Sequence, residues 1–457
     1  MFRPITRRTL LAMTAASCVA FSGAGAFAAE AAMTPAQADV KLTEIVNGWG
    51  NADKALAGLA AIRIKNGEIA YEYHSGSIDG LSRDGVVAGD ENALYRVASI
   101  SKMVFAIGVM DLVESGQLDL DADVSEYLGF PLRNPNFPDT AITARMLLSH
   151  TSSIRDGSVY SIPIPHTLEA FFTEGGAYYE KGAHFATAED THGLKPGEYF
   201  KYTNLNFGVL ATIAERITGE RFDHFMRDRV LMPLNIDASY NPRTLSDEAF
   251  SNLVPLYRPV DGAWVAQVDD YQGERPDDVL RVENPDGDDT QGAAEIPLSD
   301  YVIGTNGTIF SPQGGLRISA RDLARIGQFF INGGELDGVR LLKPETVDAM
   351  IAPVWTFDGN NGHTYWGLMQ EYGLSVQNLL GKATDEGSDI TWEGYTGGLS
   401  GHAGEAYGLL SGLYFDVETG DGYVYILQGT PNLDDNYGSY SSFFNWEEGV
   451  LTTLNGL

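Results

Sequence analysis

A serine and a lysine at helical spacing are the first residues of this chain that could carry out chemistry. Ser99 and Lys102 form its only S-x-x-K sequence. Residues three apart on a helix lie on one face, so the Lys102 amine can reach the proton of the Ser99 hydroxyl. Burial would lower the pKa of Lys102 and let it act as a base. A pattern with two fixed positions also arises by chance, so it needs support from other residues.

Tyr202 and Asn204 form a second candidate, just before a helix expected to start near Asn206. The Tyr202 hydroxyl could relay a proton between the nucleophile and the leaving group, while Asn204 could orient the substrate or Lys102. The alternative is a core tyrosine whose hydroxyl has a structural hydrogen bond.

A third candidate is the segment that leads into the C-terminal strands. Gly404 would let a substrate approach the strand backbone, and the N–H of Glu405 could serve as an oxyanion donor. The unpaired N–H groups and the positive dipole end at the start of the helix that carries Ser99 would also favour the oxyanion. His402 could donate to the substrate from the strand edge, or could form a structural hydrogen bond instead.

Metal and cofactor chemistry have no motif here. The histidines, including His150 in the sequence LLSHTS, show no H-x-H, H-E-x-x-H or H-x-x-E-H spacing. The segment 398–402 fails the G-x-S-x-G pattern at its last position. We therefore expect no zinc site and no organic cofactor.

The three candidates follow one another in a fixed order: S-x-x-K, then Y-x-N about 100 residues later, then H-x-G about 200 residues further on. In this order the chain resembles the serine β-lactamase and penicillin-binding-protein superfamily, in the branch of class C β-lactamases, D-alanyl-D-alanine carboxypeptidases, D-aminopeptidases and β-lactamase-like esterases. Further family-like segments cover nearly all of the chain after its first residues: Leu118 to Asp123, Ile142 to Ser152, Phe200 to Gly219, Gln313 to Leu336 and Gly401 to Phe415.

The resemblance assigns a role to each candidate. It implies that Ser99 is the acylated nucleophile, Lys102 its base or proton shuttle, and Tyr202 the acid and base that serves the leaving group and the deacylating water. It also implies an oxyanion hole made by the N–H groups of Ser99 and Glu405, with Asn204, His402 and Gly404 in substrate binding.

One departure from the family pattern bears on the substrate. β-Lactamases usually have Lys-Thr-Gly where this chain has His402-Ala403-Gly404, and that lysine helps to bind the β-lactam carboxylate. A carboxylesterase-like or peptidase-like hydrolase is therefore favoured over a β-lactamase or D-alanyl-D-alanine carboxypeptidase. The alternative from another class is a non-catalytic protein of the same fold that binds or senses peptidoglycan.

The elements that must position these residues can be read from hydrophobic periodicity. Residues 60–74 alternate around Asn66-Gly67 and predict a β-hairpin, and 409–416 with 423–428 predict a second one, so both ends of the chain contribute to the sheet. Between them, helical patterns begin at Ser99, near Asn206 and at Ser319, and end before glycines.

This order of elements predicts an α/β (α+β) fold: a β-lactamase-like antiparallel sheet flanked by helices, with an inserted, mostly helical domain. The sheet domain would combine 40–105 with 300–457, and the helical domain would span 106–299. Two segments are expected to be loop insertions, 155–195 and 255–311, the second of which lies in the helical domain as far as 299. Its acidic stretch, 284–289, is expected to be a solvated loop, with a cation-binding loop as the alternative.

Residues 1–28 predict an export signal, with a twin-arginine pattern at Arg7-Arg8, an apolar run and Ala26-Phe27-Ala28 for cleavage. Arg7 and Arg8 also fit an ordinary positive segment. The lone cysteine, Cys18, lies inside this stretch, which leaves no thiol for the exported protein. A formal charge of -32 argues against nucleic acid and anionic membranes as partners. We expect a protein outside the cytoplasm that acts on a small or peptide-like acyl substrate.

Overall fold

The computed structural model describes residues 32–76, 90–277, 279–282, 294–431, 433 and 436–457. The chain divides into two units, Met1–Ala32 and Met33–Leu457, and the second contains every element described below. The predicted export signal and the acidic stretch 284–289 lie outside the described residues. Among those that are described, no helix is both long enough and apolar enough to cross a membrane.

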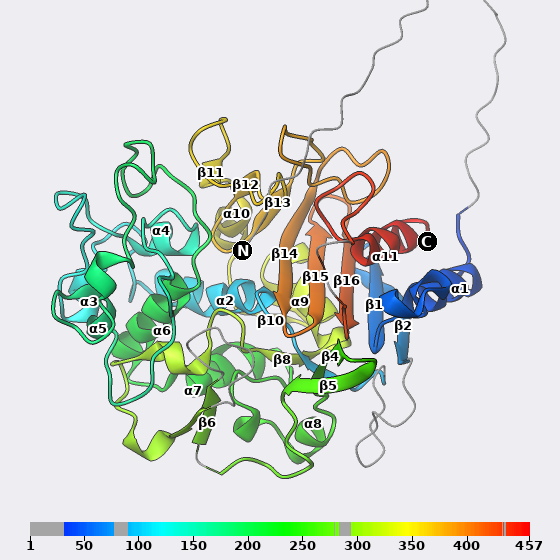
Figure 1. Ribbon diagram of the computed structural model, residues 1–457, viewed down its shortest axis with the longest axis horizontal. Helices are drawn as coiled ribbons and strands as arrows, with labels where there is room; N and C mark the ends of the chain where they lie inside the picture. Colours follow the sequence, from blue (N-terminus) through cyan, green and yellow to red (C-terminus); the bar gives the residue numbers. More distant parts are fainter. Residues whose placement is uncertain (1–31, 77–89, 278, 283–293, 432, 434–435) are drawn as a thin grey trace, which may run out of the picture. The chain divides into compact units, whose positions relative to one another are not determined.

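An eight-stranded antiparallel sheet organises this unit (Figure 1). Its first hairpin turns at Asn66-Gly67, where both residues have positive φ, as the predicted turn requires. The last strand of the chain in this sheet pairs with the first, from Gly58↔Gln428 onward, so the prediction that both chain ends build the sheet is confirmed. In spatial order the strands are β11 (Trp355–Thr356), β12 (Glu371–Tyr372), β13 (Gln377–Leu379), β14 (Leu399–Ala406), β15 (Leu409–Asp416), β16 (Asp421–Gln428), β1 (Gly58–Lys65) and β2 (Glu68–Gly76).

Helices cover both faces of the sheet, and strand β1 shows why. Its side chains alternate in direction, so Ile62 and Ile64 enter one buried cluster and Leu59 and Ala61 enter another. Helix α9 (Ala320–Ile331) packs in the first cluster, and helices α1 (Pro35–Val46) and α11 (Asn445–Asn455) pack together in the second (Figure 1). The predicted antiparallel sheet flanked by helices is confirmed.

Two central helices carry the candidate residues. Helix α2 (Ile100–Glu114) is buried on nearly every side, which fits its almost uniformly apolar sequence. Helix α6 (Leu205–Thr218) ends at Gly219, whose left-handed φ of 71° forms the predicted stop. Serine 319 caps α9 by accepting from the N–H of Asp322 at 3.0 Å, also as predicted.

The segment 255–311 differs from its expected loop structure. It contains a hairpin of β4 (Leu256–Val260) and β5 (Ala263–Val268), joined by Asp261-Gly262 with positive φ at both residues. An Asp-Gly pair between alternating residues is a hairpin signal that the sequence analysis missed. A second pair of strands, β6 (Val279–Val282) and β7 (Ala294–Pro297), lies in the same segment. The division into sheet and helical domains stays a prediction.

The remaining elements are short. The helices are α3 (Ser125–Leu128), α4 (Ala144–Leu148), α5 (Glu169–Phe172), α7 (Phe222–Met226), α8 (Asp247–Ser251) and α10 (Pro344–Ile351). The strands are β3 (Leu94–Arg96), β8 (Arg317–Ser319), β9 (Glu335–Leu336) and β10 (Val339–Arg340). Single turns are η1 (Gly48–Gly50), η2 (Ala52–Lys54), η3 (Glu180–Gly182), η4 (Arg227–Leu231), η5 (Pro242–Thr244), η6 (Leu298–Asp300) and η7 (Gly307–Phe310).

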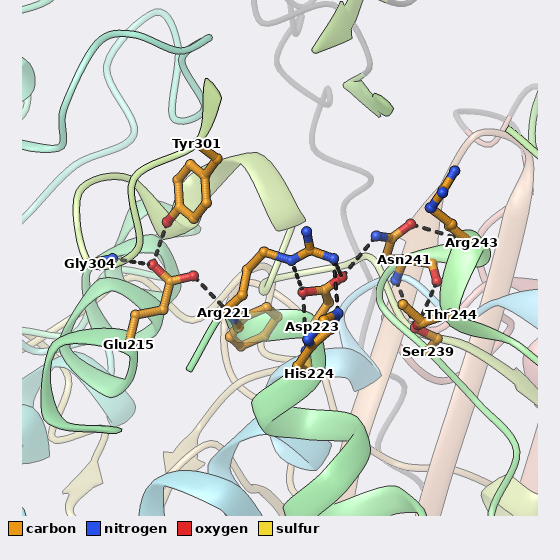
Figure 2. A network of polar contacts seen from close by, with 11 residues as sticks. Glu215, Arg221, Asp223, His224, Ser239, Asn241, Arg243, Thr244, Tyr301 and Gly304 are labelled. Carbon is orange, nitrogen blue, oxygen red and sulfur yellow. Dashed lines mark hydrogen bonds and ion pairs between the residues drawn. The ribbon is translucent and has the colours of Figure 1, made fainter. Parts of the chain in front are cut away.

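A polar network joins α6 to α7, to η5 and to the segment around 301–304 (Figure 2). The Glu215 carboxylate accepts hydrogen bonds from the Tyr301 hydroxyl, the Gly304 N–H and the Phe222 N–H. Since buried carboxylates need such partners, the network fixes the segment around 301–304 against α6.

Candidate active site

Serine 99 lies at the turn between β3 and α2. The Val97 N–H donates to the Leu316 carbonyl at 2.9 Å, and the Leu316 N–H donates to Ser101 Oγ at 3.0 Å. Between them Ala98 adopts a φ of 48°, a conformation that costs a non-glycine residue about 1 kcal/mol or more. These hydrogen bonds hold the strained turn and present Ser99 at the start of the helix.

The Lys102 amine points to the nucleophile. Its Nζ donates to Ser99 Oγ at 3.0 Å and to the Gln313 carbonyl at 2.8 Å, and the side chain is fully buried. Burial lowers the pKa of Lys102 to about 7, with Asp156 acting in the opposite direction. A large fraction of the amine is therefore neutral near pH 7, as a general base requires.

The centre of the Tyr202 ring lies 4.7 Å from Lys102 Nζ. Its hydroxyl oxygen is buried and forms no hydrogen bond with the described residues. Burial raises the pKa of Tyr202, while the nearby Ser99 hydroxyl acts in the opposite direction. The phenol is thus protonated at neutral pH and free to donate to a reacting group.

His150 supports Tyr202, a role that the sequence analysis missed. Its ring stacks on the Tyr202 ring at 4.3 Å and 30°, and its Nδ1 accepts from the Thr203 N–H at 3.0 Å. Burial and, next, the Lys102 charge hold the pKa of His150 well below its usual value, so the ring is neutral. Only its position in the family-like segment 142–152 distinguished this histidine in the sequence.

Asp156 is a second residue that the sequence analysis missed. Its carboxylate accepts from Asn204 Nδ2 at 3.0 Å and from the Leu205 N–H at 2.9 Å. Burial raises the pKa of Asp156, whereas these donors and Lys102 lower it. The Asn204 amide nitrogen therefore holds Asp156, and no sequence spacing links these residues, because they meet only through folding.

Strand β14 lies against the Ser99 turn at Gly404. A Cβ atom on Gly404 would lie 2.6 Å from the Val97 carbonyl oxygen and 3.2 Å from the Ser99 nitrogen. Only glycine therefore lets β14 pack this closely against the Ser99 turn, whether or not a substrate also contacts Gly404. Among the described strands, residues 402–406 pair only with β15, so the other edge of this part of β14 has no strand partner. Glu405 directly follows Gly404, the residue that approaches the Ser99 turn.

His402 is buried inside the wall of the site. Its Nδ1 hydrogen bonds to the Ala403 carbonyl, so Nε2 accepts from the Tyr372 hydroxyl at 2.8 Å. Burial and then the Lys102 charge lower the pKa of His402 to about 3. The structure therefore gives His402 the structural hydrogen bond that was the alternative to substrate contact.

The model of the family described as Beta-lactamase matches residues 33–441. The chain belongs to the beta-lactamase family. This result confirms the predicted family and fold, and with them the prediction of a serine hydrolase.

Individual relatives of this beta-lactamase family member are distant. Penicillin-binding protein 4 of Amycolatopsis lactamdurans is 26% identical over 372 residues, which are 80% of this chain and 77% of that protein. Protein flp of Staphylococcus aureus (strain NCTC 8325 / PS 47) is 26% identical over 181 residues, 40% of this chain, and the chain spans only 34% of its length.

Two solved structures share the fold of the family member. EstCE1, a hydrolase with promiscuous acyltransferase activity, has a TM-score of 0.60 at 18% identity, covering 91% of this chain and 99% of that one. The D-amino acid amidase from Ochrobactrum anthropi SV3, complexed with D-phenylalanine, has a TM-score of 0.57 at 19% identity, covering 92% and 98%. At these identities the likeness extends to the fold alone.

Proposed function

We propose that this protein hydrolyses ester or amide bonds through a Ser99 acyl-enzyme, with carboxylesterase-like or peptidase-like specificity. One observation carries the proposal: a fully buried lysine donates to the Ser99 hydroxyl at 3.0 Å, next to a tyrosine hydroxyl that has no partner among the described residues. A structural core rarely buries a lysine amine completely, and it rarely leaves a buried phenol without a hydrogen bond.

Acylation uses these groups in order. Neutral Lys102 accepts the Ser99 proton as Oγ forms a bond to the substrate carbonyl carbon. The N–H groups of Ser99 and Glu405 stabilise the oxyanion. The Tyr202 hydroxyl then gives its proton to the leaving alcohol or amine as the carbonyl–leaving group bond breaks, and takes up the proton held by Lys102.

Deacylation reverses these roles. A water molecule attacks the acyl carbon, its proton passes to the Tyr202 and Lys102 pair, and Ser99 Oγ leaves with a proton from that pair. The products are a carboxylic acid and the free serine. His150 stacks on Tyr202 and holds its ring in place. Asp156, whose carboxylate accepts from Asn204, supplies a negative charge near Lys102.

β-Lactam hydrolysis is the less favoured specificity. Where related β-lactamases have a lysine, His402 is neutral and uses Nε2 for Tyr372. It therefore offers no ammonium to the carboxylate of a penicillin. We expect kcat/KM for 4-nitrophenyl butyrate to exceed that for nitrocefin by at least about tenfold, measured under one set of conditions. A clear preference for nitrocefin would identify a β-lactamase instead.

The covalent intermediate provides the direct test. The purified protein is incubated with activated esters, D-amino-acid amides and penicillins, and its intact mass is measured. Wild type should gain one acyl group, whereas Ser99→Ala should gain none and lose turnover; Lys102→Ala should lose nearly as much turnover, because the two act as a unit. Hydrolysis by Ser99→Ala at the wild-type rate would refute the proposal. Binding without any covalent adduct would favour the non-catalytic alternative.

We also propose that the protein is exported. The segment 1–28 would direct export, so that the enzyme works in the periplasm or outside the cell. Determining the N-terminal sequence of protein recovered from the periplasm tests it, with cleavage expected after Ala28.

A further inference from the structure

Positive charges are scarce in this protein, and most of the described arginines are paired with carboxylates. The sequence has 30 Lys+Arg against 62 Asp+Glu, so carboxylates are abundant. Eleven arginines of the described chain form ion pairs with them: Arg63, Arg133, Arg145, Arg221, Arg227, Arg229, Arg275, Arg317, Arg321, Arg325 and Arg340.

Arg155 is an exception to this pattern among the arginines, and Lys201 resembles it in its surroundings. Both side chains are partly buried, and no carboxylate of the described residues lies within 4.0 Å of either charged group. The guanidinium of Arg155 donates to the carbonyl of its own neighbour, Ile154, at 2.8 Å. The Lys201 amine lies over the Tyr365 ring, 5.3 Å from its centre.

Both cations lie at the edge of the candidate site: Arg155 directly precedes Asp156, which accepts from Asn204, and Lys201 directly precedes Tyr202. Burial first, and then the Arg155 charge, lowers the pKa of Lys201. Tyr365, which lies under the Lys201 amine, packs its ring 5.9 Å from that of Tyr202 and donates to the Tyr202 carbonyl at 3.3 Å. Folding has therefore placed two positive charges near Tyr202, although the repulsion between them opposes this arrangement.

The neighbouring carboxylates are engaged elsewhere. Asp156 uses both oxygens for Asn204 and Leu205. Asp190 accepts from the N–H and the hydroxyl of Thr187 at 2.7 and 2.8 Å. Both act on Arg155 only at longer range. The cations thus keep donors that the protein does not use, in a place where unpaired charge is costly.

We propose that Arg155 and Lys201 form a subsite for a carboxylate carried by the substrate. This inference rests on the proposed hydrolase function and narrows its substrate class to anionic esters or amides. The guanidinium matches the planar carboxylate, and the amine adds a second charge-assisted hydrogen bond. The acidic surface does not prevent this, because its repulsion is screened beyond about 8 Å at physiological salt.

The subsite lies on different elements from the third family motif. Arg155 precedes α5 and Lys201 precedes α6, whereas His402 belongs to β14 and remains neutral. A substrate recognised here would therefore carry its charge away from β14, where related β-lactamases have the carboxylate-binding lysine.

Three chromogenic esters test the proposal. 4-Nitrophenyl butyrate is neutral, mono-4-nitrophenyl glutarate has a carboxylate on the acyl side, and 4-butyryloxy-3-nitrobenzoate has one on the leaving group. We expect wild type to prefer one of the two anionic esters over the neutral one by at least about tenfold in kcat/KM. Which ester is preferred assigns the carboxylate to the acyl or the leaving-group side.

Variants connect that preference to the two cations. Arg155→Gln and Lys201→Gln should each reduce the anionic-to-neutral ratio by about tenfold, and Arg155→Lys should restore part of it. Arg227→Gln, which removes an exposed charge paired with Asp228, is the matched control and should leave the ratio unchanged. If a variant does not fold, raising the salt concentration with wild type gives a second measurement, because the ratio should fall with ionic strength.

The possible failures are distinguishable. Cleavage of the neutral ester with no preference for either anionic one, or with a ratio that neither the variants nor salt changes, overturns the subsite and leaves the proposed function standing. Absence of cleavage of all three esters, together with no acylation of Ser99, overturns the proposed function itself.

Discussion

At the scale of single residues, the site depends on two groups that burial has moved away from their ordinary protonation. Lys102 loses part of its charge, and Tyr202 keeps its proton, because both are removed from solvent. Near neutral pH, Lys102 can therefore accept a proton while Tyr202 can donate one.

Tyr202→Phe preserves the ring and removes the hydroxyl. Turnover of an activated ester should fall by about 10²-fold or more, since the phenol serves the leaving group. The melting temperature should change little, because the hydroxyl has no hydrogen bond within the described chain. Steady-state kinetics and thermal unfolding check both parts. A loss of less than about threefold would make Tyr202 a packing residue only.

The lowered pKa of Lys102 predicts a pH profile. Only the neutral amine can accept the Ser99 proton, and the pKa of Lys102 is about 7. The value of kcat/KM should therefore rise with pH, changing about tenfold per pH unit well below 7 and levelling off above it. A flat profile between about pH 5 and pH 9 would contradict the role of Lys102 as base.

At the scale of elements, the approach of β14 to the start of α2 decides where the oxyanion donors lie. Gly404→Ala would place a Cβ 2.4 Å from Ser411 Oγ and 2.6 Å from the Val97 carbonyl, so the strand must move away from Ser99. We expect kcat to fall by about 10²-fold, with a smaller effect on KM. Gly314→Ala is the matched control, because its Cβ would meet nothing nearer than 3.8 Å. Equal activity of the two variants would remove β14 from the oxyanion hole.

The same scale shows what could be predicted from the sequence. Ser99 and Lys102 are three residues apart on one helix, so local geometry alone brings them together. Tyr202 entered through the order of the motifs. His150 and Asp156 reach the site from a loop, and their contacts depend on packing between elements that no local pattern encodes. The hairpin at Asp261-Gly262 was missed for a different reason, since its turn signal was present and not used.

At the scale of the molecule, the network around Glu215 makes stability depend on pH. Burial raises the pKa of Glu215 to about 7, against the hydrogen bonds that lower it. In the unfolded chain its pKa returns to the ordinary 4.5, so the folded protein binds more protons between these values. The stability contributed by this group is complete below about pH 4.5 and is lost as pH rises through about 7.

Glu215→Gln should remove that dependence. Relative to the variant, wild type should lose about 3 kcal/mol of unfolding free energy between about pH 5 and pH 8, measured by denaturant titration at several pH values. Glu220→Gln is the control, because Glu220 pairs with Arg229 near the surface at 2.9 Å. Identical pH dependence in wild type and Glu215→Gln would show that the buried carboxyl does not control stability.

The pairing of β1 with β16 has a consequence for how the protein is made. During synthesis, the hairpin of β1 and β2 leaves the ribosome early and has no strand partner on one side until residues 421–428 follow it. Completion of the sheet must therefore wait for almost the whole chain, because the pairing that joins its first hairpin to its C-terminal strands is distant in sequence. A product terminated before β16 would expose the edge of β1 and tend to aggregate, so chaperone dependence should be concentrated in the nascent chain.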